Sequence, residues 1–290
     1  MRKIFCAVLT CLTISCGHPG NDSGNKIITV SIAPFKYFVE QIAGNDFKIN
    51  VMVPAGADPH VYEPFPEQIN QLRKSVAYIS NGFLGFEMNW LDRFYETNPS
   101  MKKLSLGEKI EPLASDHHHE GGHMELADPH YWVSPKCAMI IASSVKDLLC
   151  ELNPSQKQKY ETNFLLLNSK IQEMDNKARG LFSDVQGKSF MIYHPNLAYL
   201  ARDYGLEEIP VEYEGKEPTA LRMRELIDVA RKDNLKTIFV QREYDTKNAR
   251  AIAGEIGATI VLIDPLSADW QQSTEEIIEA LHKSLLESSK

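Results

Sequence analysis

The pattern of hydrophobic and polar residues predicts short strands that alternate with helical stretches from residue 26 onward. The strands fall into two groups separated by a long gap. They are predicted at Lys26–Ile32, Phe47–Val53, Val76–Ser80 and Lys103–Leu106, and then at Ser189–Tyr193, Ile209–Tyr213, Lys236–Val240 and Thr259–Ile263. This alternation predicts an α/β fold of two lobes, each with a small, mostly parallel four-stranded sheet flanked by helices.

A long amphipathic segment lies between the two groups of strands. Asn153-Pro154 is a helix start signal, because an N-cap residue precedes a proline in the first turn. Apolar residues then recur in steps of four and three from Tyr160 to Leu181. This spacing predicts one rigid helix from 154 to about 184, roughly 45 Å long. A coiled-coil dimer would show a similar stripe, but a helix that joins two lobes explains its place between them.

The first residues have the pattern of an export signal. Two basic residues precede an apolar run, Ile4–Ile14, which is too short to span a bilayer. The run ends in Thr13-Ile14-Ser15-Cys16-Gly17, which resembles a bacterial lipobox, although leucine or valine is usual where Thr13 stands. A polar stretch rich in Gly, Asn and Ser follows at 17–25, as a tether requires. We therefore predict lipidation of Cys16 rather than plain cleavage.

Cysteine use and net charge narrow the functional classes. Beyond the signal only Cys137 and Cys150 remain, on one predicted helix that begins at Ser134-Pro135. At 1.5 Å per residue they lie about 20 Å apart, beyond the ~7 Å limit for a disulfide, so we expect two buried thiols and no disulfide. The net charge of −8 argues against nucleic acid as a partner and is compatible with attracting cations.

One tetrapeptide occurs twice, as Ala57-Asp58-Pro59-His60 and Ala127-Asp128-Pro129-His130. Proline fixes its own φ and restricts the residue before it, so each histidine is presented by a stiffened backbone. Such presentation suits a metal ligand, although each histidine alone could be an ordinary surface residue.

Two further candidate ligands directly follow predicted strands of the second lobe. They are His194 and Asp264, and each stands beside a proline. Ligands of α/β sheets bind outside the carboxyl ends of the strands. We therefore predict that His60, His130, His194 and Asp264 form one metal site in the cleft between the lobes. Three imidazoles and one carboxylate can close a tetrahedral Zn²⁺ site, and they would also accept Mn²⁺ or Fe²⁺.

A histidine-rich segment at 116–123 precedes the second Asp-Pro-His, and its glycines are typical of a mobile loop that collects metal. Its histidines are His117, His118, His119 and His123. Residues 119–123 also match the HExxH pattern of metalloproteases. That chemistry needs a rigid helix, and the central Gly-Gly costs a helix about 1 kcal/mol per residue, so the protease interpretation is disfavoured.

Together these motifs resemble the zinc/manganese solute-binding proteins of bacterial ABC importers. The matching segments are Pro54–Pro64, the histidine-rich loop, Asp128–Trp132, Tyr193-His194 followed by Tyr199–Gly205, and Ile263–Leu266. The resemblance covers almost the whole chain after residue 26. It implies metal held in a cleft between two lobes that a long rigid helix joins, and delivery to a membrane permease whose ATPase powers uptake. By position, His60, His130 and His194 match the family's histidine ligands, and Asp264 matches the carboxylate of many members.

The chain departs from the family pattern in two places. Ser134 stands where an aspartate commonly precedes proline, and Pro195 stands where an aspartate commonly follows the third histidine. Hydrogen bonds around the ligands are therefore expected to differ. The stretch Glu212–Glu217 resembles an acidic loop near the cleft mouth and is equally compatible with a charged, solvated turn.

The resulting prediction is an exported, monomeric, lipid-anchored protein at the periplasmic face of the envelope. It captures a divalent metal, with zinc favoured over manganese or iron, and passes it to an ABC permease and its ATPase. The predicted parts are a signal with its lipidation site (1–16), a tether (17–25), an N-terminal lobe (26–152), a linking helix (153–186) and a C-terminal lobe (187–290). Four protein ligands leave no position for an activated water, so no catalysis is expected. A secreted zinc hydrolase and a surface adhesin remain as alternatives.

Overall fold

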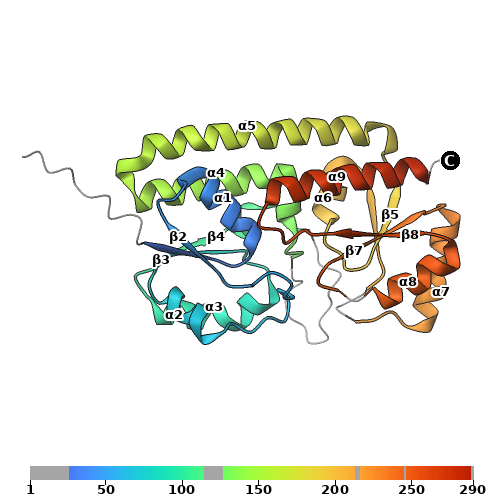
Figure 1. Ribbon diagram of the computed structural model, residues 1–290, viewed down its shortest axis with the longest axis horizontal. Coiled ribbons are helices and arrows are strands. Elements are labelled where there is room, and N and C mark those ends of the chain that lie inside the picture. Colours follow the sequence, from blue (N-terminus) through green and yellow to red (C-terminus); the bar gives the residue numbers. More distant parts are fainter. Residues whose placement is uncertain (1–25, 114–126, 213–215, 245, 289–290) are drawn as a thin grey trace, which may run out of the picture.

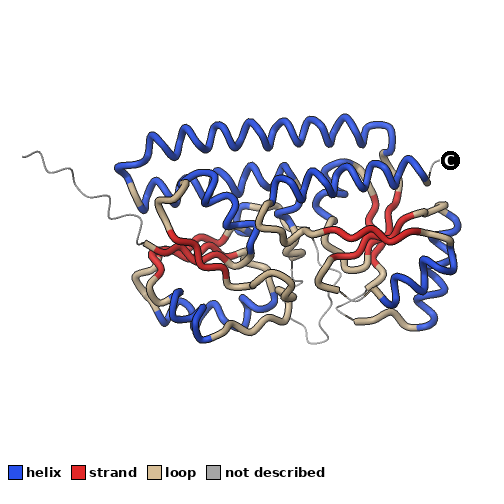
Figure 2. The backbone as a smooth tube through the Cα atoms, in the orientation of Figure 1, coloured by secondary structure: helices blue, strands red, loops and turns tan. Residues whose placement is uncertain are grey.

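The computed structural model describes residues 26–113, 127–212, 216–244 and 246–288. The predicted signal with Cys16, the tether and the histidine-rich segment at 116–123 lie outside the described residues. Figure 1 shows two lobes side by side beneath long helices that cover both. Figure 2 shows that strands form the middle of each lobe, with helices above and below them. The predicted two-lobed α/β fold is therefore confirmed.

The N-terminal lobe contains four parallel strands in the order β2-β1-β3-β4. The strands are β1 (Ile27–Val30), β2 (Lys48–Val51), β3 (Ser75–Ser80) and β4 (Lys102–Ser105). The connecting helices are α1 (Ala33–Ala43), α2 (Pro66–Leu72) and α3 (Gly85–Thr97). Helix α1 covers one face of the sheet, and α2 and α3 cover the other (Figure 1). The carboxyl ends of all four strands consequently share one edge, which faces the second lobe.

The C-terminal lobe repeats this plan with the strand order β6-β5-β7-β8. Its strands are β5 (Ser189–Ile192), β6 (Glu207–Pro210), β7 (Thr237–Gln241) and β8 (Thr259–Ile263), and its helices are α6 (Ala198–Tyr204), α7 (Ala220–Lys232), α8 (Lys247–Ile256) and α9 (Trp270–Glu287). All eight predicted strands are found. The largest shift is in β6, which starts at Glu207 because Glu207 pairs with Ser189 of β5. Tertiary register, rather than the apolar pattern, sets this boundary.

The predicted long helix is α5 (Lys157–Phe182), and short 3₁₀ turns extend it at both ends. It follows α4 (Pro135–Leu152) and runs along both lobes (Figure 1). Helix α5 packs against α1 and α4 over the first lobe and against α6 and α9 over the second. The apolar stripe is therefore buried within the chain, which removes the reason for a coiled-coil interpretation. Cys137 and Cys150 both lie on α4 and are free; Cys137 is buried, and Cys150 is half-buried rather than buried as expected.

Two hydrophobic cores support the lobes. The larger core is continuous through the N-terminal lobe, the long helices and one face of the C-terminal sheet, where it includes Phe190 and Phe239. The smaller core lies between the other face of that sheet and helices α7 and α8, and it includes Met191 and Ile238. Neighbouring residues of β5 and β7 enter different cores because successive side chains of a strand point to opposite faces.

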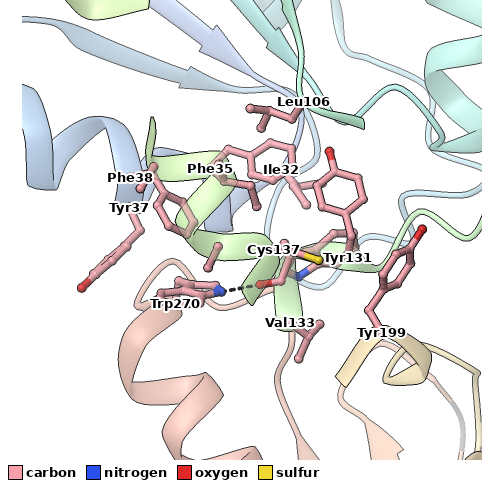
Figure 3. Close-up of a cluster of buried hydrophobic side chains, with 14 of the residues drawn as sticks. Ile32, Phe35, Tyr37, Phe38, Leu106, Tyr131, Val133, Cys137, Tyr199 and Trp270 are labelled. Atoms are coloured by element: carbon pink, nitrogen blue, oxygen red, sulfur yellow. Dashed lines mark hydrogen bonds between the residues drawn. The ribbon is translucent and has the colours of Figure 1, made fainter. Parts of the chain in front are cut away.

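Two tryptophans fasten the lobes together on the side of the long helices. The indole Nε1 of Trp270 donates to the carbonyl oxygen of Trp132 at 2.7 Å, drawn as a dashed line in Figure 3. The indole of Trp132 in turn donates to the carbonyl oxygen of Pro265 at 2.9 Å. Figure 3 shows Trp270, from the start of α9, beside Phe38 of α1. The loop after β8 is thereby held against the segment after His130. Across the described ranges, the structure has no helix long and apolar enough to cross a bilayer.

Candidate metal centre

Three histidines from three loops converge between the lobes. The Nε2 atom of His60 lies 3.2 Å from that of His130 and 3.1 Å from that of His194. The remaining pair, His130 and His194, is separated by 3.4 Å. Two of the imidazoles come from the N-terminal lobe and one from the C-terminal lobe. Within the described ranges, these three form the one group of His, Cys, Asp or Glu side chains whose ligand atoms are close enough to share an ion.

The spacing of the three nitrogens matches that of a zinc coordination sphere. With Zn–N bonds of about 2.05 Å, the nitrogens of a tetrahedral site lie about 3.3–3.4 Å apart. An ion placed on the axis of the observed triangle can therefore bind all three Nε2 atoms with little rearrangement. The fourth corner of the tetrahedron is left for another donor.

Each Asp-Pro-His motif forms the same local turn. The Oδ1 atom of Asp58 accepts the backbone N–H of His60 at 2.8 Å, and that of Asp128 accepts the N–H of His130 at 2.7 Å. An aspartate that accepts the amide two residues later stabilises a turn without help from distant residues. The repeat in the sequence is therefore a repeat in structure, and it places both N-terminal histidines by local interactions.

Carboxylates fix the orientation of two of the imidazoles. The Nδ1 atom of His130 lies 2.8 Å from Asp128 Oδ1, and the Nδ1 atom of His194 lies 3.2 Å from Glu212 Oε2. A carboxylate at Nδ1 keeps the proton there and leaves the Nε2 lone pair for a metal. Two such lone pairs 3.4 Å apart repel each other, and a cation between them removes the repulsion. These four side chains are all at least nine-tenths buried, which strengthens the interactions.

The backbone of His194 is held by a side chain from the neighbouring strand. Gln241, the last residue of β7, donates its Nε2 to the carbonyl oxygen of His194 at 2.6 Å and accepts the N–H of His194 at 3.3 Å. The ring of Tyr244 stacks on the imidazole, with ring centroids 4.7 Å apart and an angle of 15° between the planes. His194 is thus positioned by residues far away in the sequence.

A small cavity lies where the three imidazoles meet. It encloses about 20 Å³, which is room for about one water-sized guest. Besides the histidines, Asn196, Glu243 and Tyr244 line it. Burial raises the pKa of Asp58 and of Glu243, and nearby carboxylates raise both further. A cleft that is lined by carboxylates and has surroundings of low dielectric constant attracts cations.

Comparison with known proteins identifies the family. The family described as ZnuA, zinc-uptake complex component A, periplasmic, matches residues 28–285. The chain belongs to this family.

Solved structures of ZnuA share the fold over nearly their full length. A crystal structure of ZnuA is 36% identical with a TM-score of 0.83, covering 89% of this chain and 98% of that one. A ZnuA deletion mutant with zinc bound is also 36% identical, with a TM-score of 0.82 over 89% of this chain and 97% of that one. The laminin-binding protein Lmb of Streptococcus agalactiae, 21% identical with a TM-score of 0.78 over 90% of this chain and all of that one, shows the fold alone.

Among curated proteins the chain is similar to larger zinc-binding proteins. The zinc-binding lipoprotein AdcA of Streptococcus pneumoniae is 25% identical over 304 residues, which cover 98% of this chain and 60% of AdcA. The zinc-binding protein AdcA of Streptococcus pyogenes is 27% identical over 269 residues, covering 83% of this chain and 50% of that protein. The matched region thus spans 50–60% of the length of these AdcA proteins.

In this ZnuA-family chain the fourth predicted ligand stands apart from the histidines. Asp264 follows β8 as expected, but it is not a member of the group of side chains that share one point. Its Oδ2 atom lies 3.8 Å from Nη1 of Arg242, and a third of its side chain is exposed. The role of Asp264 as a ligand therefore stays a prediction.

Sequence reasoning assigned no role to several residues that shape the candidate site. Asp58 and Asp128 were visible as part of the repeat, and their position two residues before each histidine was the signal for a turn. Gln241, Tyr244 and Asn196 carried no comparable signal, because they reach the site only through tertiary folding. The auxiliary role expected for His117, His118, His119 and His123 falls outside the described residues.

Proposed function

We propose that this chain is the extracytoplasmic binding component of an ABC importer and that it captures Zn²⁺ between its lobes. His60, His130 and His194 hold the ion through their Nε2 atoms. The observation that carries this proposal is the convergence of the three nitrogens, from both lobes, at 3.1–3.4 Å from one another. Membership of a periplasmic zinc-uptake family and relatives named for zinc binding support it.

The donor set favours zinc over the alternative cargoes. Imidazole nitrogen suits zinc, whereas manganese prefers sites richer in oxygen. The carboxylates of Asp128 and Glu212, which contact two of the ligands, add negative charge that balances a dication. Mn²⁺ and Fe²⁺ remain alternative cargoes, because divalent affinity rises from manganese towards copper at almost any such site.

Asp264 is the proposed carboxylate of the closed site. It comes from the loop after β8 and would have to leave the neighbourhood of Arg242 to reach the ion. A tetrahedral ion with four protein ligands has no position for an activated water, so we propose a carrier without catalytic activity. A zinc hydrolase is the second candidate, since three histidines are also the ligand set of some zinc enzymes.

Delivery would follow from small movements at the cleft. Hydrogen bonds of Trp132 and Trp270 fasten the lobes on the side of the long helices, so a wide hinge opening would break packed contacts. We propose release by loop shifts that break one or two ligand bonds at a permease coupled to an ATPase. A lipid on Cys16 would hold the monomer at the periplasmic face of the envelope, and the segment 116–123 would collect metal for the cleft.

Zinc-induced stabilisation tests whether both lobes share one ion. A ligand that binds only the folded state stabilises it by about 4 kcal/mol at a thousandfold excess over Kd. We expect the zinc-induced rise in melting temperature to be lost in His60→Ala and in His194→Ala. The metal-free melting temperature should change little in His60→Ala and should fall in His194→Ala, which removes the buried imidazole that contacts Glu212 and Tyr244. His282→Ala is the matched control, because His282 lies on α9 next to Phe182, away from the cleft.

The double variant tests the shared ion directly. His60→Ala with His194→Ala should cost much less than the sum of the single variants, because both residues act on one ion. Additive losses, or a full zinc shift in the His194→Ala protein, would refute a site between the lobes. Hydrolysis of a chromogenic ester that requires zinc and His60 would favour the hydrolase instead.

A further inference from the structure

One residue that lines the cavity between the histidines has a buried side-chain oxygen without a hydrogen-bond partner in the described residues. Asn196 lines this cavity and is 5% exposed. Its side-chain oxygen, Oδ1, is fully buried, and no donor among the described residues reaches it. Buried carbonyl oxygens in native proteins nearly always have a partner, since leaving one unpaired costs free energy. The partner of Oδ1 is therefore expected to be a species that enters the cavity.

Hydrogen bonds hold the backbone around Asn196, and they keep this residue at the wall of the cavity. The Oε1 atom of Glu208 accepts the N–H groups of Asn196 and Leu197, at 3.2 and 2.7 Å. The side chain of Gln241 makes hydrogen bonds to both the N–H and the carbonyl group of His194, which lies two residues before Asn196. The segment from 194 to 197 is thus held at both ends, and a loop rotation that removes Asn196 from the site would break several hydrogen bonds.

We propose that Asn196 is a further residue of the metal site and that its Oδ1 atom binds the ion at the fourth position. This inference rests on the proposed function. In the arrangement of the lobes seen here, Asp264 lies beside Arg242. Asn196 lines the cavity together with Gln241 and Glu243, and among these polar side chains it is the one with a buried oxygen that lacks a hydrogen-bond partner in the described residues. The site is then three imidazoles and one amide oxygen.

The chemistry of an amide oxygen fits a carrier that has to release its cargo. The amide oxygen carries a partial negative charge that attracts a cation, but it lacks the full charge of a carboxylate. If the Asn196 oxygen replaced the Asp264 carboxylate as the fourth ligand, the ion would be bound less tightly, and the lobes would not have to open widely. Asn196 and Asp264 lie in the loops after β5 and β8, at the same end of one parallel sheet in which β7 separates these two strands, so both loops border the same cleft.

Two substitutions at Asn196 separate metal binding from a structural role. Asn196→Ala removes the oxygen, and we expect zinc affinity to fall about ten- to hundredfold, as when a supporting group of a metal site is lost. Asn196→Asp keeps an oxygen at the same place and adds charge, so zinc affinity should match or exceed that of the unaltered protein. If Asn196 acted through its side-chain N–H groups instead, both changes would remove these donors, and both would lower zinc affinity. Asn163→Ala, which alters a half-buried amide of α5 that donates to Ile42, is the matched control.

Cobalt provides the readout that packing alone would not change. Co²⁺ loaded in place of Zn²⁺ reports the donor set through its visible absorption, which should change in Asn196→Ala and not in Asn163→Ala. The proposal stands only if Asn196→Ala weakens zinc binding, Asn196→Asp restores it and the cobalt spectrum responds; any other combination overturns it. His60→Ala is measured in parallel. If zinc still binds tightly to that variant, the proposed function itself fails; if it does not, a negative result at Asn196 rejects only this inference.

Discussion

The two lobes hold their histidines in different ways. In the N-terminal lobe, His60 and His130 each donate their backbone N–H to an aspartate two residues earlier in the chain. In the C-terminal lobe, His194 depends on Glu212 and Gln241, which are 18 and 47 residues away. The first lobe therefore encodes its ligand geometry locally, whereas the second needs its folded sheet to do so.

The two lobes also share one hydrogen-bond pattern, in which a glutamate accepts two consecutive backbone N–H groups near a ligand loop. In the N-terminal lobe Glu87 accepts those of Asn81 and Gly82, at 2.8 and 2.6 Å. In the C-terminal lobe Glu208 does so at residues 196–197. The difference is burial, since Glu87 is fully buried and Glu208 is only partly buried. The same contact therefore has a greater electrostatic cost in the first lobe.

The largest expected effect follows from that cost. Burial raises the pKa of Glu87 to about 7, although hydrogen bonds from Ser31 and the backbone oppose this rise. Since the unfolded state ionises first, near 4.5, folding stability from this group is fully present below about pH 4.5 and is lost as the pH rises to about 7. The loss is on the order of 3 kcal/mol. Glu87→Gln should remove this pH dependence, so the variant should gain stability relative to the unaltered protein by about this amount as the pH rises from about 4.5 to 7.

Urea unfolding at several pH values measures this difference. Glu208→Gln serves as the counterpart in the second lobe, where the glutamate that accepts two backbone N–H groups is only partly buried. A stability difference for Glu87→Gln that is constant from pH 4.5 to 7 would show that the buried carboxyl ionises normally.

Features that depend on local sequence could be predicted, whereas contacts between distant residues could not. The eight strands and the linking helix were visible as apolar periods, and the convergence of His60, His130 and His194 was expected from their places after strands. The stack of Tyr244 on His194 and the unpaired oxygen of Asn196 were not visible. These contacts join residues that are distant in the chain and depend on side-chain direction, which periodicity does not encode.

Asp264 illustrates the same limit within a correct fold. Its position after β8 was predicted, but its Oδ2 atom lies 3.8 Å from Nη1 of Arg242, the residue after β7, and the carboxylate is not among the histidine nitrogens. Sequence position fixes the loop on which a ligand lies. It does not fix which of two partners, an arginine or an ion, the side chain contacts in a given state.

The second prediction compares the carboxylates that orient one histidine in each lobe. Asp128→Asn and Glu212→Gln each replace the carboxylate at an imidazole Nδ1 by an uncharged amide. Each change should weaken zinc binding about ten- to hundredfold, because the imidazole loses basicity and its fixed tautomer. Competition with a chromogenic zinc chelator measures these affinities.

A local and a distant anchor should differ in their effect on the metal-free protein. Asp128→Asn also affects a turn, because Asp128 accepts the backbone N–H of His130, so its metal-free melting temperature should fall more than that of Glu212→Gln. Glu207→Gln, an exposed change on β6, controls for loss of charge alone. Equal affinity in the unaltered protein and Glu212→Gln would mean that the third imidazole needs no carboxylate.

The smallest expected effects come from a pair of glycines, one in each lobe. A Cβ added at Gly85, the first residue of α3, would lie 2.5 Å from the carbonyl oxygen of His60, so the backbone of the ligand loop has to shift. We expect Gly85→Ala to cost at least about 1 kcal/mol, because a backbone atom rather than the end of a flexible side chain has to move. If the shift moves the imidazole, zinc affinity falls about fivefold, the equivalent of that energy.

Gly254 is the matched position in the C-terminal lobe. It lies within α8, and a Cβ there would meet no atom within 4 Å. Gly254→Ala should therefore stabilise the protein by about 0.5–1 kcal/mol through helix propensity and leave zinc affinity unchanged. Urea unfolding should show a loss of stability for Gly85→Ala and a gain for Gly254→Ala. Competition with a chelator then measures whether zinc affinity falls in the first variant only. If Gly85→Ala binds zinc as tightly as Gly254→Ala, the contact between α3 and the His60 loop does not position the ligand, and the Asp58 turn alone suffices.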